Sequence, residues 1–148
     1  MSSIEVIFMF LGGLPTGSVL DCWLKCGIKN NERIAIVCHS KDPNIEHDLG
    51  NVHLTRRVET AWATSSLVDA TLIMMEEAYN KFKNAKKFIL LSPSCIPLYN
   101  IDKLIDKVLE NNKTWITQVC YEHNKNSFDC DIFLASQWFI TILQTLKF

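Results

Sequence analysis

Residues 4–13 read Ile-Glu-Val-Ile-Phe-Met-Phe-Leu-Gly-Gly, a nearly unbroken apolar run that stops at two glycines. β-Branched and aromatic residues without regular polar alternation are typical of a strand buried on both faces, as at the centre of a parallel sheet. The run is too short to cross a bilayer, which needs about 18 apolar residues. We therefore predict a central strand at residues 4–11 and work outward from it.

Strand-like and helix-like patterns alternate along the next hundred residues. The predicted elements are strands at 33–38, 52–58 and 88–91 and helices at 16–25, 65–87 and 100–109. This alternation indicates an α/β fold in which helices flank an open, mostly parallel sheet. We treat residues 1–148 as a single domain or one lobe of a larger protein.

Two helix starts carry capping signals. Ser65 and Ser66, with Asp69 in the first turn, are close to a capping box, and Asn100 is suited to cap the following helix. The apolar spacing in the first of these helices predicts the inward face Val68, Leu72, Met75, Tyr79 and Phe82. The polar stretch at 113–129 is expected to be a loop.

Composition limits the classes of partner. Charged residues make up 21% of the 148 residues and the formal net charge is −1, which argues against nucleic acid or an anionic membrane recognised through bulk charge. The six cysteines include no CxxC motif. Cys22 and Cys26 would share a helix face, as a disulfide, a metal edge or plain buried thiols. No signal peptide or membrane span is predicted, and the localisation stays open.

In open α/β sheets, ligands bind beyond the carboxyl ends of the strands. Small and polar residues occupy the predicted ends, at Gly12-Gly13, His39-Ser40, Thr60 to Ser66 and Ser92 to Ser94. They let a ligand approach the backbone, and a helix beginning at Ser66 offers amides to an anion. The pattern fits a nucleotide pocket, although the same residues also serve as ordinary turn formers.

Other chemical signals are weak. His39 has three interpretations: a general base, a metal ligand or a structural hydrogen-bonding group. Asp129-Cys130-Asp131 is a DxD, the pair that holds a divalent cation on a diphosphate in many transferases, but it precedes its strand instead of following one. The sequence contains no GxSxG, no GxxxxGK and no GxGxxG.

Five segments, in order, resemble motifs of the core-2/I-branching N-acetylglucosaminyltransferase family. Phe10 to Pro15 with Trp23 resembles its first strand and "PLxPLW" loop, and Ile36 to Ser40 its "YVH" strand end. Residues 61–70 are similar to "WGxxSxVDA", residues 88–99 to "FxLLSxSCxPL", and residues 136–139 read "SQWF". The resemblance spans residues 10–139 and is closest to the plant-like and microbial branch.

The resemblance implies a GT-A type Rossmann-like fold and an inverting transfer of a sugar. N-Acetylglucosamine or xylose would pass from a UDP-sugar to a hydroxyl of a glycan or protein, a carboxylate removing the hydroxyl proton. It also implies that no metal is needed, because basic side chains neutralise the diphosphate. The expected cofactors and metal sites are therefore none, and the expected partners are a UDP-sugar donor and a glycan or glycoprotein acceptor.

The resemblance assigns roles to ten residues. The expected donor-binding residues are His39 and Ser40 at the base or ribose, Trp62, Ser66 and Asp69 around the pocket, and Ser92 and Ser94 at the sugar, and the expected acceptor-side residues are Ser136, Gln137 and Trp138. Trp62 and Trp138 have an alternative interpretation as packing anchors.

The chain departs from the family pattern after Phe139. The family's catalytic carboxylate follows SQWF, whereas the nine residues after Phe139 contain no acid, and residues 140–148 are largely apolar. We therefore expect a sheet that is incomplete at its carboxyl end, a base beyond residue 148, and a further lobe or partner covering 140–148. The alternative is a catalytically inactive nucleotide-sugar-binding or protein-interaction module on the same fold. The resemblance implies a Golgi or ER membrane-associated enzyme, or a cytoplasmic protein if the chain is a remnant.

Overall fold

The computed structural model describes the backbone of residues 3–120 and 133–142 and the side chains of residues 3–115. The elements in these residues are β1 (Val6–Gly12), α1 (Gly17–Lys25), β2 (Ile34–Ser40), β3 (Val52–Leu54), α2 (Ser66–Lys81), β4 (Lys87–Leu91), α3 (Ile101–Leu109), β5 (Trp115–Cys120) and β6 (Phe133–Ile142). The order of the first seven elements confirms the sequence prediction. β3 is shorter than the predicted strand at 52–58, and α2 ends before the predicted residue 87.

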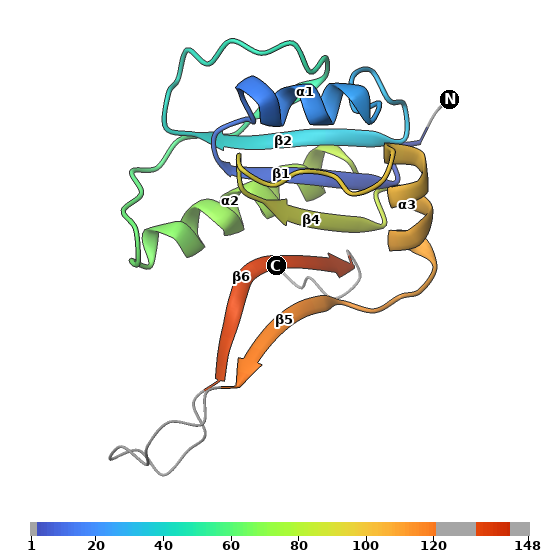
Figure 1. The fold of residues 1–148 in the computed structure, drawn as a ribbon. Helices are drawn as coiled ribbons and strands as arrows, with labels where there is room; N and C mark the ends of the chain where they lie inside the picture. The colour runs from blue at the N-terminus through green and yellow to red at the C-terminus, as the bar shows by residue number, and fades with distance from the viewer. Residues whose placement is uncertain (1–2, 121–132, 143–148) are drawn as a thin grey trace.

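The strands form one sheet in the order β3-β2-β1-β4-β6-β5. β3, β2, β1 and β4 are parallel, whereas β6 pairs antiparallel with β4 and with β5. Figure 1 shows the β5–β6 hairpin extending from the lower edge of this sheet. The predicted open, mostly parallel α/β sheet is therefore confirmed, with an antiparallel pair added next to β4.

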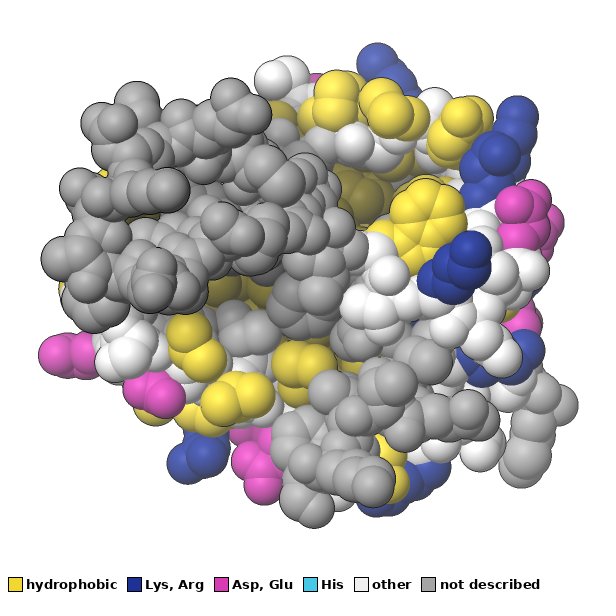
Figure 2. Space-filling model, turned by 90° about the horizontal axis from the view of Figure 1, so that it is seen from below, with side chains coloured by type: hydrophobic (Ala, Val, Ile, Leu, Met, Phe, Trp, Pro, Cys, Tyr) yellow, Lys and Arg dark blue, Asp and Glu magenta, His cyan; other side chains and the backbone are white. Residues whose placement is uncertain are grey.

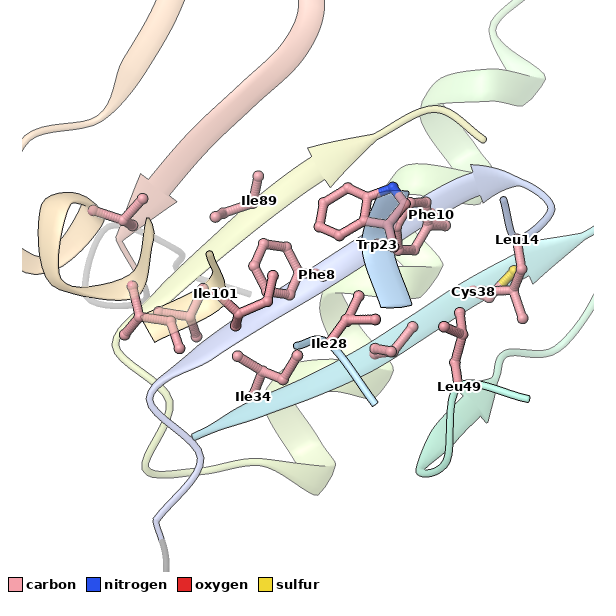
Figure 3. Close-up of a cluster of buried hydrophobic side chains, with 14 residues drawn as sticks. Phe8, Phe10, Leu14, Trp23, Ile28, Ile34, Cys38, Leu49, Ile89 and Ile101 are labelled. Atoms are coloured by element: carbon pink, nitrogen blue, oxygen red, sulfur yellow. The ribbon is translucent and has the colours of Figure 1, made fainter. Parts of the chain in front are cut away.

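Two helical layers cover the sheet. Trp23 of α1 and Ile101 and Ile105 of α3 pack with Phe8 and Phe10 of β1, on one face (Figure 3). The indole of Trp23 meets both phenyl rings edge-on, with centroid distances of 5.7 and 5.6 Å. α2 covers the opposite face, and the side chains of β1 alternate between the two layers. This three-layer arrangement buries the central strand on both sides.

Ion pairs close the amino edge of the parallel strands. Arg33 Nε lies 2.6 Å from Glu5 Oε2, Arg33 Nη2 lies 2.8 Å from Asp106, and Lys86 Nζ lies 2.9 Å from Glu5 Oε1. The hydrogen bonds from Lys86 and Arg33 hold the pKa of Glu5 below its ordinary value. The network connects the starts of β1, β2 and β4 with α3.

Lys87, the first residue of β4, is only 1% exposed. Its ammonium donates to the carbonyl oxygen of Lys113, 2.9 Å away, and burial lowers its pKa. This bond joins β4 to the segment that leads into β5. The prediction that 113–129 is a polar loop is wrong for residues 115–120, where Trp115 and Val119 belong to a strand.

The buried face of α2 differs from the predicted one. Val68 and Leu72 are 58% and 49% exposed, whereas Ala70, Met74 and Ala78 are fully buried. The small alanines let the helix axis approach the sheet closely, so the buried stripe is rotated away from the larger residues. Toward the end of the helix the prediction holds. Met75 is buried, and Tyr79 and Phe82, the other two residues of the predicted face, are partly buried against the same core.

Two neighbouring substitutions test this rotation. Ile73→Ala should lower the free energy of unfolding of the protein by about 2–4 kcal/mol, because the Ile73 side chain is only 7% exposed. Leu72→Ala, one residue away, should cost less than about 1 kcal/mol, because the side chain is half exposed. Urea denaturation followed by circular dichroism measures both losses. A larger loss for Leu72→Ala than for Ile73→Ala would show that α2 packs through the face predicted from spacing.

Candidate functional site

The carboxyl ends of β1, β2 and β4 lie at one edge of the sheet. Gly12 pairs with Ser40, and Phe10 pairs with Leu91, so the residues after each strand start at nearly the same level. The amino end of α2 lies at the same edge (Figure 1). The structure therefore brings Ser40, Ser66 and Ser92 to one side of the molecule.

Antiparallel pairing directs β6 toward the same edge. Ile140 pairs with Ile89, and the strands run in opposite directions, so moving back along β6 from Ile140 follows β4 toward its carboxyl end. Residues 136–138, the predicted acceptor side, precede Ile140 in this strand. The pairing with β4 ends at Ile140, and Figure 1 shows β6 bending away from the parallel strands, so the place of residues 136–138 at the acceptor side stays a prediction.

Local hydrogen bonds shape each strand end. Ser40 Oγ accepts from the Asp42 amide at 3.1 Å, and Ser92 Oγ accepts from the Ser94 amide at 3.2 Å. Gly12 has a φ of +99°, which favours glycine where β1 turns into its loop. Both serines thus act as turn formers. Their contacts with a donor stay a prediction.

Trp23 positions the loop after β4. Its buried indole Nε1–H donates to the carbonyl oxygen of Cys95, 2.8 Å away and 72 residues along the chain. Within the loop, the Cys95 amide donates to the Ser92 carbonyl at 3.1 Å. The two motifs that resemble "PLxPLW" and "FxLLSxSCxPL" are therefore in direct contact, through a bond that fixes Ser92–Cys95 above the sheet.

His39 has a structural role in the observed geometry. The side chain is 1% exposed, and its Nε2 accepts a hydrogen bond from the Val58 amide at 3.1 Å. An accepting Nε2 requires a neutral ring with its proton on Nδ1. Burial, aided by the charge of Arg57, holds the pKa of His39 below its ordinary value. His39 thus anchors the segment between β3 and α2 to the end of β2.

The start of α2 does not form the predicted capping box. Ser65 makes no side-chain cap, whereas Ser66 Oγ accepts from the Ala61 amide at 3.0 Å and hydrogen-bonds to Thr64 Oγ1. The amides of residues 67, 68 and 69 donate to carbonyls at 64 and 65. These three amides are therefore occupied, and the expectation that the helix start offers free amides to an anion is wrong for them. Asp69 is exposed in the first turn, where its negative charge interacts favourably with the helix dipole.

Trp62 is 91% exposed, so its interpretation as a packing anchor is wrong. The loop around it is nevertheless well defined, because Thr64 Oγ1 donates to the Ala61 carbonyl at 2.8 Å. Ala63 adopts a left-handed conformation with φ of 58°, at the position where the "WGxxS" motif has glycine. An apolar ring held in solvent beside the strand ends is available to a ligand.

Large hydrophobic side chains are also exposed after β4. Ile96 is 54% and Leu98 83% exposed, and Leu98 stands at the last position of the "FxLLSxSCxPL" motif. Figure 2 shows hydrophobic side chains exposed among charged ones on the face seen from below. The exposure of Leu98 indicates that this motif position does not serve the core.

A half-open pocket of about 230 Å³ lies at this edge, on the β2–β3 side. It is lined by Lys41, Arg57, Val58, Glu59 and Thr60, which follow β2 and β3. None of the ten predicted site residues lines it, although His39 supports its Val58. Thr60 lies in the predicted strand-end segment 60–66, whereas Arg57 and Val58 were not expected at the site because the predicted strand at 52–58 assigned them to the sheet. The signal for this pocket in the sequence is the pair of charged residues Arg57 and Glu59 shortly after β3.

The described residues contain neither a metal-binding cluster nor a membrane-spanning helix. Residues 3–115 contain no group of three or more His, Cys, Asp or Glu side chains that could hold a metal. The DxD at 129–131 lies outside the described residues. The described cysteines, Cys22, Cys26, Cys38 and Cys95, are free thiols, which agrees with the plain-thiol alternative. No helix in the described part of the chain is long and apolar enough to cross a membrane.

The neutral state of His39 predicts a stability that depends on pH. Because its pKa is lower in the folded than in the unfolded chain, its contribution is fully present above pH 6.5 and is lost as the pH falls through the folded pKa. The slope can reach about 1.4 kcal/mol per pH unit for one proton. Denaturation between pH 7.5 and 5.5 measures it. His39→Gln, which keeps an acceptor for the Val58 amide but does not titrate, should flatten the slope, and an unchanged slope would assign it elsewhere.

Ala63→Gly should stabilise the chain by about 0.5–1 kcal/mol. Glycine removes the steric cost of the left-handed conformation, partly offset by its greater backbone entropy in the unfolded state. Ala61→Gly is the matched control, because Ala61 has no positive φ and should lose stability. Thermal unfolding of both variants gives the comparison. If both glycines destabilise equally, the conformation assigned to Ala63 is incorrect.

Comparisons with known proteins bear on what this edge does. The family model for "Core-2/I-Branching enzyme" matches residues 6–139, which includes β1, the loops at the strand ends and most of β6. A search of curated proteins finds no match. The family consists of glycosyltransferases, which take a sugar from a nucleotide-sugar donor to a glycan acceptor, and the matched region contains every strand end described above. This chain therefore belongs to the core-2/I-branching enzyme family of glycosyltransferases.

Proposed function

We propose that this chain binds a UDP-sugar across the carboxyl ends of β1, β2 and β4 and presents the sugar to an acceptor hydroxyl. The observation that carries the proposal is the common level of the three strand ends, with Gly12 paired to Ser40 and Phe10 paired to Leu91. Neighbouring strands are about 4.8 Å apart, so the distance from β2 to β4 is about 10 Å. A nucleotide-sugar is long enough to extend over it.

The orientation of the donor follows from the loops. Ser92 and Ser94, held by Trp23 through Cys95, would face the sugar at β4, and Ser40 would lie toward the nucleoside at β2. Trp62, Ser66 and Asp69 would border the donor from the start of α2. Residues 136–138 of β6 would border the acceptor on the sugar side.

The proposed reaction is an inverting displacement. The acceptor oxygen forms a bond to the anomeric carbon, the bond from that carbon to the UDP oxygen breaks, and the acceptor proton passes to a carboxylate. The family pattern places that carboxylate after residues 136–139. We propose N-acetylglucosamine or xylose as the sugar, a basic side chain in place of a metal at the diphosphate, and a lumenal Golgi setting. Within the proposal, residues 1–148 form the nucleotide-sugar-binding lobe.

The alternative on the same fold is a nucleotide-sugar-binding or protein-interaction module without turnover. It is favoured by the local structural roles of Ser40, Ser66 and His39, which need no ligand to explain them. Binding alone does not separate the two functions, whereas release of UDP does.

Calorimetric titration with UDP tests the donor site. We expect a dissociation constant of roughly 0.1–1 mM, equivalent to about −4 to −5.5 kcal/mol, and no change on adding EDTA. Free UDP should appear slowly or not at all from UDP-N-acetylglucosamine with an oligosaccharide acceptor. Absence of UDP binding would refute the donor site, and EDTA sensitivity would refute the metal-free model. Rapid multiple turnover would refute the alternative of a binding module without turnover.

A further inference from the structure

The segment between α3 and β5 contains a sequon for N-glycosylation. Asn112-Lys113-Thr114 has the pattern Asn-x-Thr with a residue other than proline in the middle, and no other Asn-x-Ser or Asn-x-Thr triplet occurs in the 148 residues. A sequon in a folded protein can carry a glycan only where its asparagine lies on the surface. The place of Asn112 in the fold therefore decides what this triplet can do.

Asn112 lies in an exposed stretch. The side chains of residues 112–115 are all exposed, and Trp115, at the end of the stretch, is 53% exposed. Asn112 makes no hydrogen bond with another described residue, so the fold does not need its side-chain amide. A sugar bonded to this amide would displace no packed side chain.

The backbone next to Asn112 is nevertheless held in place. The Lys113 amide donates to Asn111 Oδ1 at 3.0 Å, which bends the chain around Asn112. The Lys113 carbonyl accepts from the buried ammonium of Lys87 at 2.9 Å. Both polar groups of the Lys113 backbone are thus bonded within the chain, and the segment is fixed beside the sheet while Asn112 stays exposed.

The sequon lies away from the strand ends that would bind the donor. Lys87, the partner of Lys113, is the first residue of β4, whereas the donor would lie beyond Leu91, the last residue of that strand. Four residue steps of about 3.3 Å, roughly 13 Å in all, separate the two ends of β4. A glycan attached to Asn112 would therefore begin at the opposite edge of the sheet, and the donor site would stay open.

We infer that Asn112 is an N-glycosylation site of this chain. The inference rests on the lumenal setting that is part of the proposed function. Asn112 Nδ2 forms a bond to the anomeric carbon of an oligosaccharide carried on a lipid diphosphate, and the bond from that carbon to the diphosphate oxygen breaks. The amide loses one proton to a carboxylate of the transferring enzyme. Thr114 supplies the hydroxyl that this enzyme requires in its acceptor.

Secretion of the full chain from eukaryotic cells, behind a cleavable signal peptide, tests the inference. Peptide N-glycosidase should lower the mass of the chain and convert Asn112 into aspartate, which peptide mass spectrometry detects at that position. Thr114→Ala should abolish both changes, and Thr114→Ser should keep them because serine retains the hydroxyl. Asn111→Gln is the matched control, since it removes the neighbouring asparagine and leaves the sequon intact, so the glycan should remain.

The outcomes separate the inference from the proposed function. A chain without a glycan whose signal peptide has been removed, from the cells or the medium, overturns the inference, and so does a glycan that persists in Thr114→Ala. Calorimetric titration of the same preparations with UDP tests the donor site independently. UDP binding without a glycan leaves the proposed function standing, whereas a glycan without UDP binding, before and after its enzymatic removal, refutes the donor site alone.

A third measurement tests the position of the glycan relative to the donor site. Removing the glycan should leave the dissociation constant for UDP unchanged, because the two lie at opposite edges of the sheet. Tighter binding of UDP after removal would overturn the inference that the glycan at Asn112 leaves the donor site open.

Discussion

The parallel hydrogen bonds of β1 to its two neighbours determine where the ends of the sheet lie. β1 is buried on both faces and pairs with β2 along seven residues and with β4 along five. A slip of one residue would turn every side chain of β1 to the opposite layer, moving Phe8 and Phe10 away from Trp23. The register is therefore determined by the core, and the level of the strand ends follows from it.

The strand ends combine two kinds of hydrogen bond. Short-range bonds, such as those from the amides of Asp42 and Ser94, set the local turns. Long-range bonds, from Trp23 to Cys95 and from Val58 to His39, connect the turns to different layers of the fold. Polar residues that the sequence suggests as ligand contacts, such as Ser40 and His39, thus already hold the fold together through hydrogen bonds. The side chains of Lys41 and Glu59, at neighbouring positions, line the pocket.

The order of the first seven elements could be predicted from the sequence, because the central strand and the Asn100 cap carry strong local signals. The inward face of α2 could not, because spacing alone does not tell whether a helix packs through large residues or through alanines such as Ala70. The strand at 115–120 was hidden by the polar residues around it. The pocket was missed since it depends on where β3 ends, and strand ends are determined by pairing more than by composition.

Lys87 has a practical consequence for studying this fold. Its amine is buried and bonded to the carbonyl of Lys113, whereas Lys41 and Lys83 are exposed. An acylating reagent would modify the exposed amines first and reach Lys87 only after β4 separates from the segment that leads to the hairpin. The rate of Lys87 acylation, measured by mass spectrometry of the peptide that contains it, therefore reports how often β4 separates from the segment before β5.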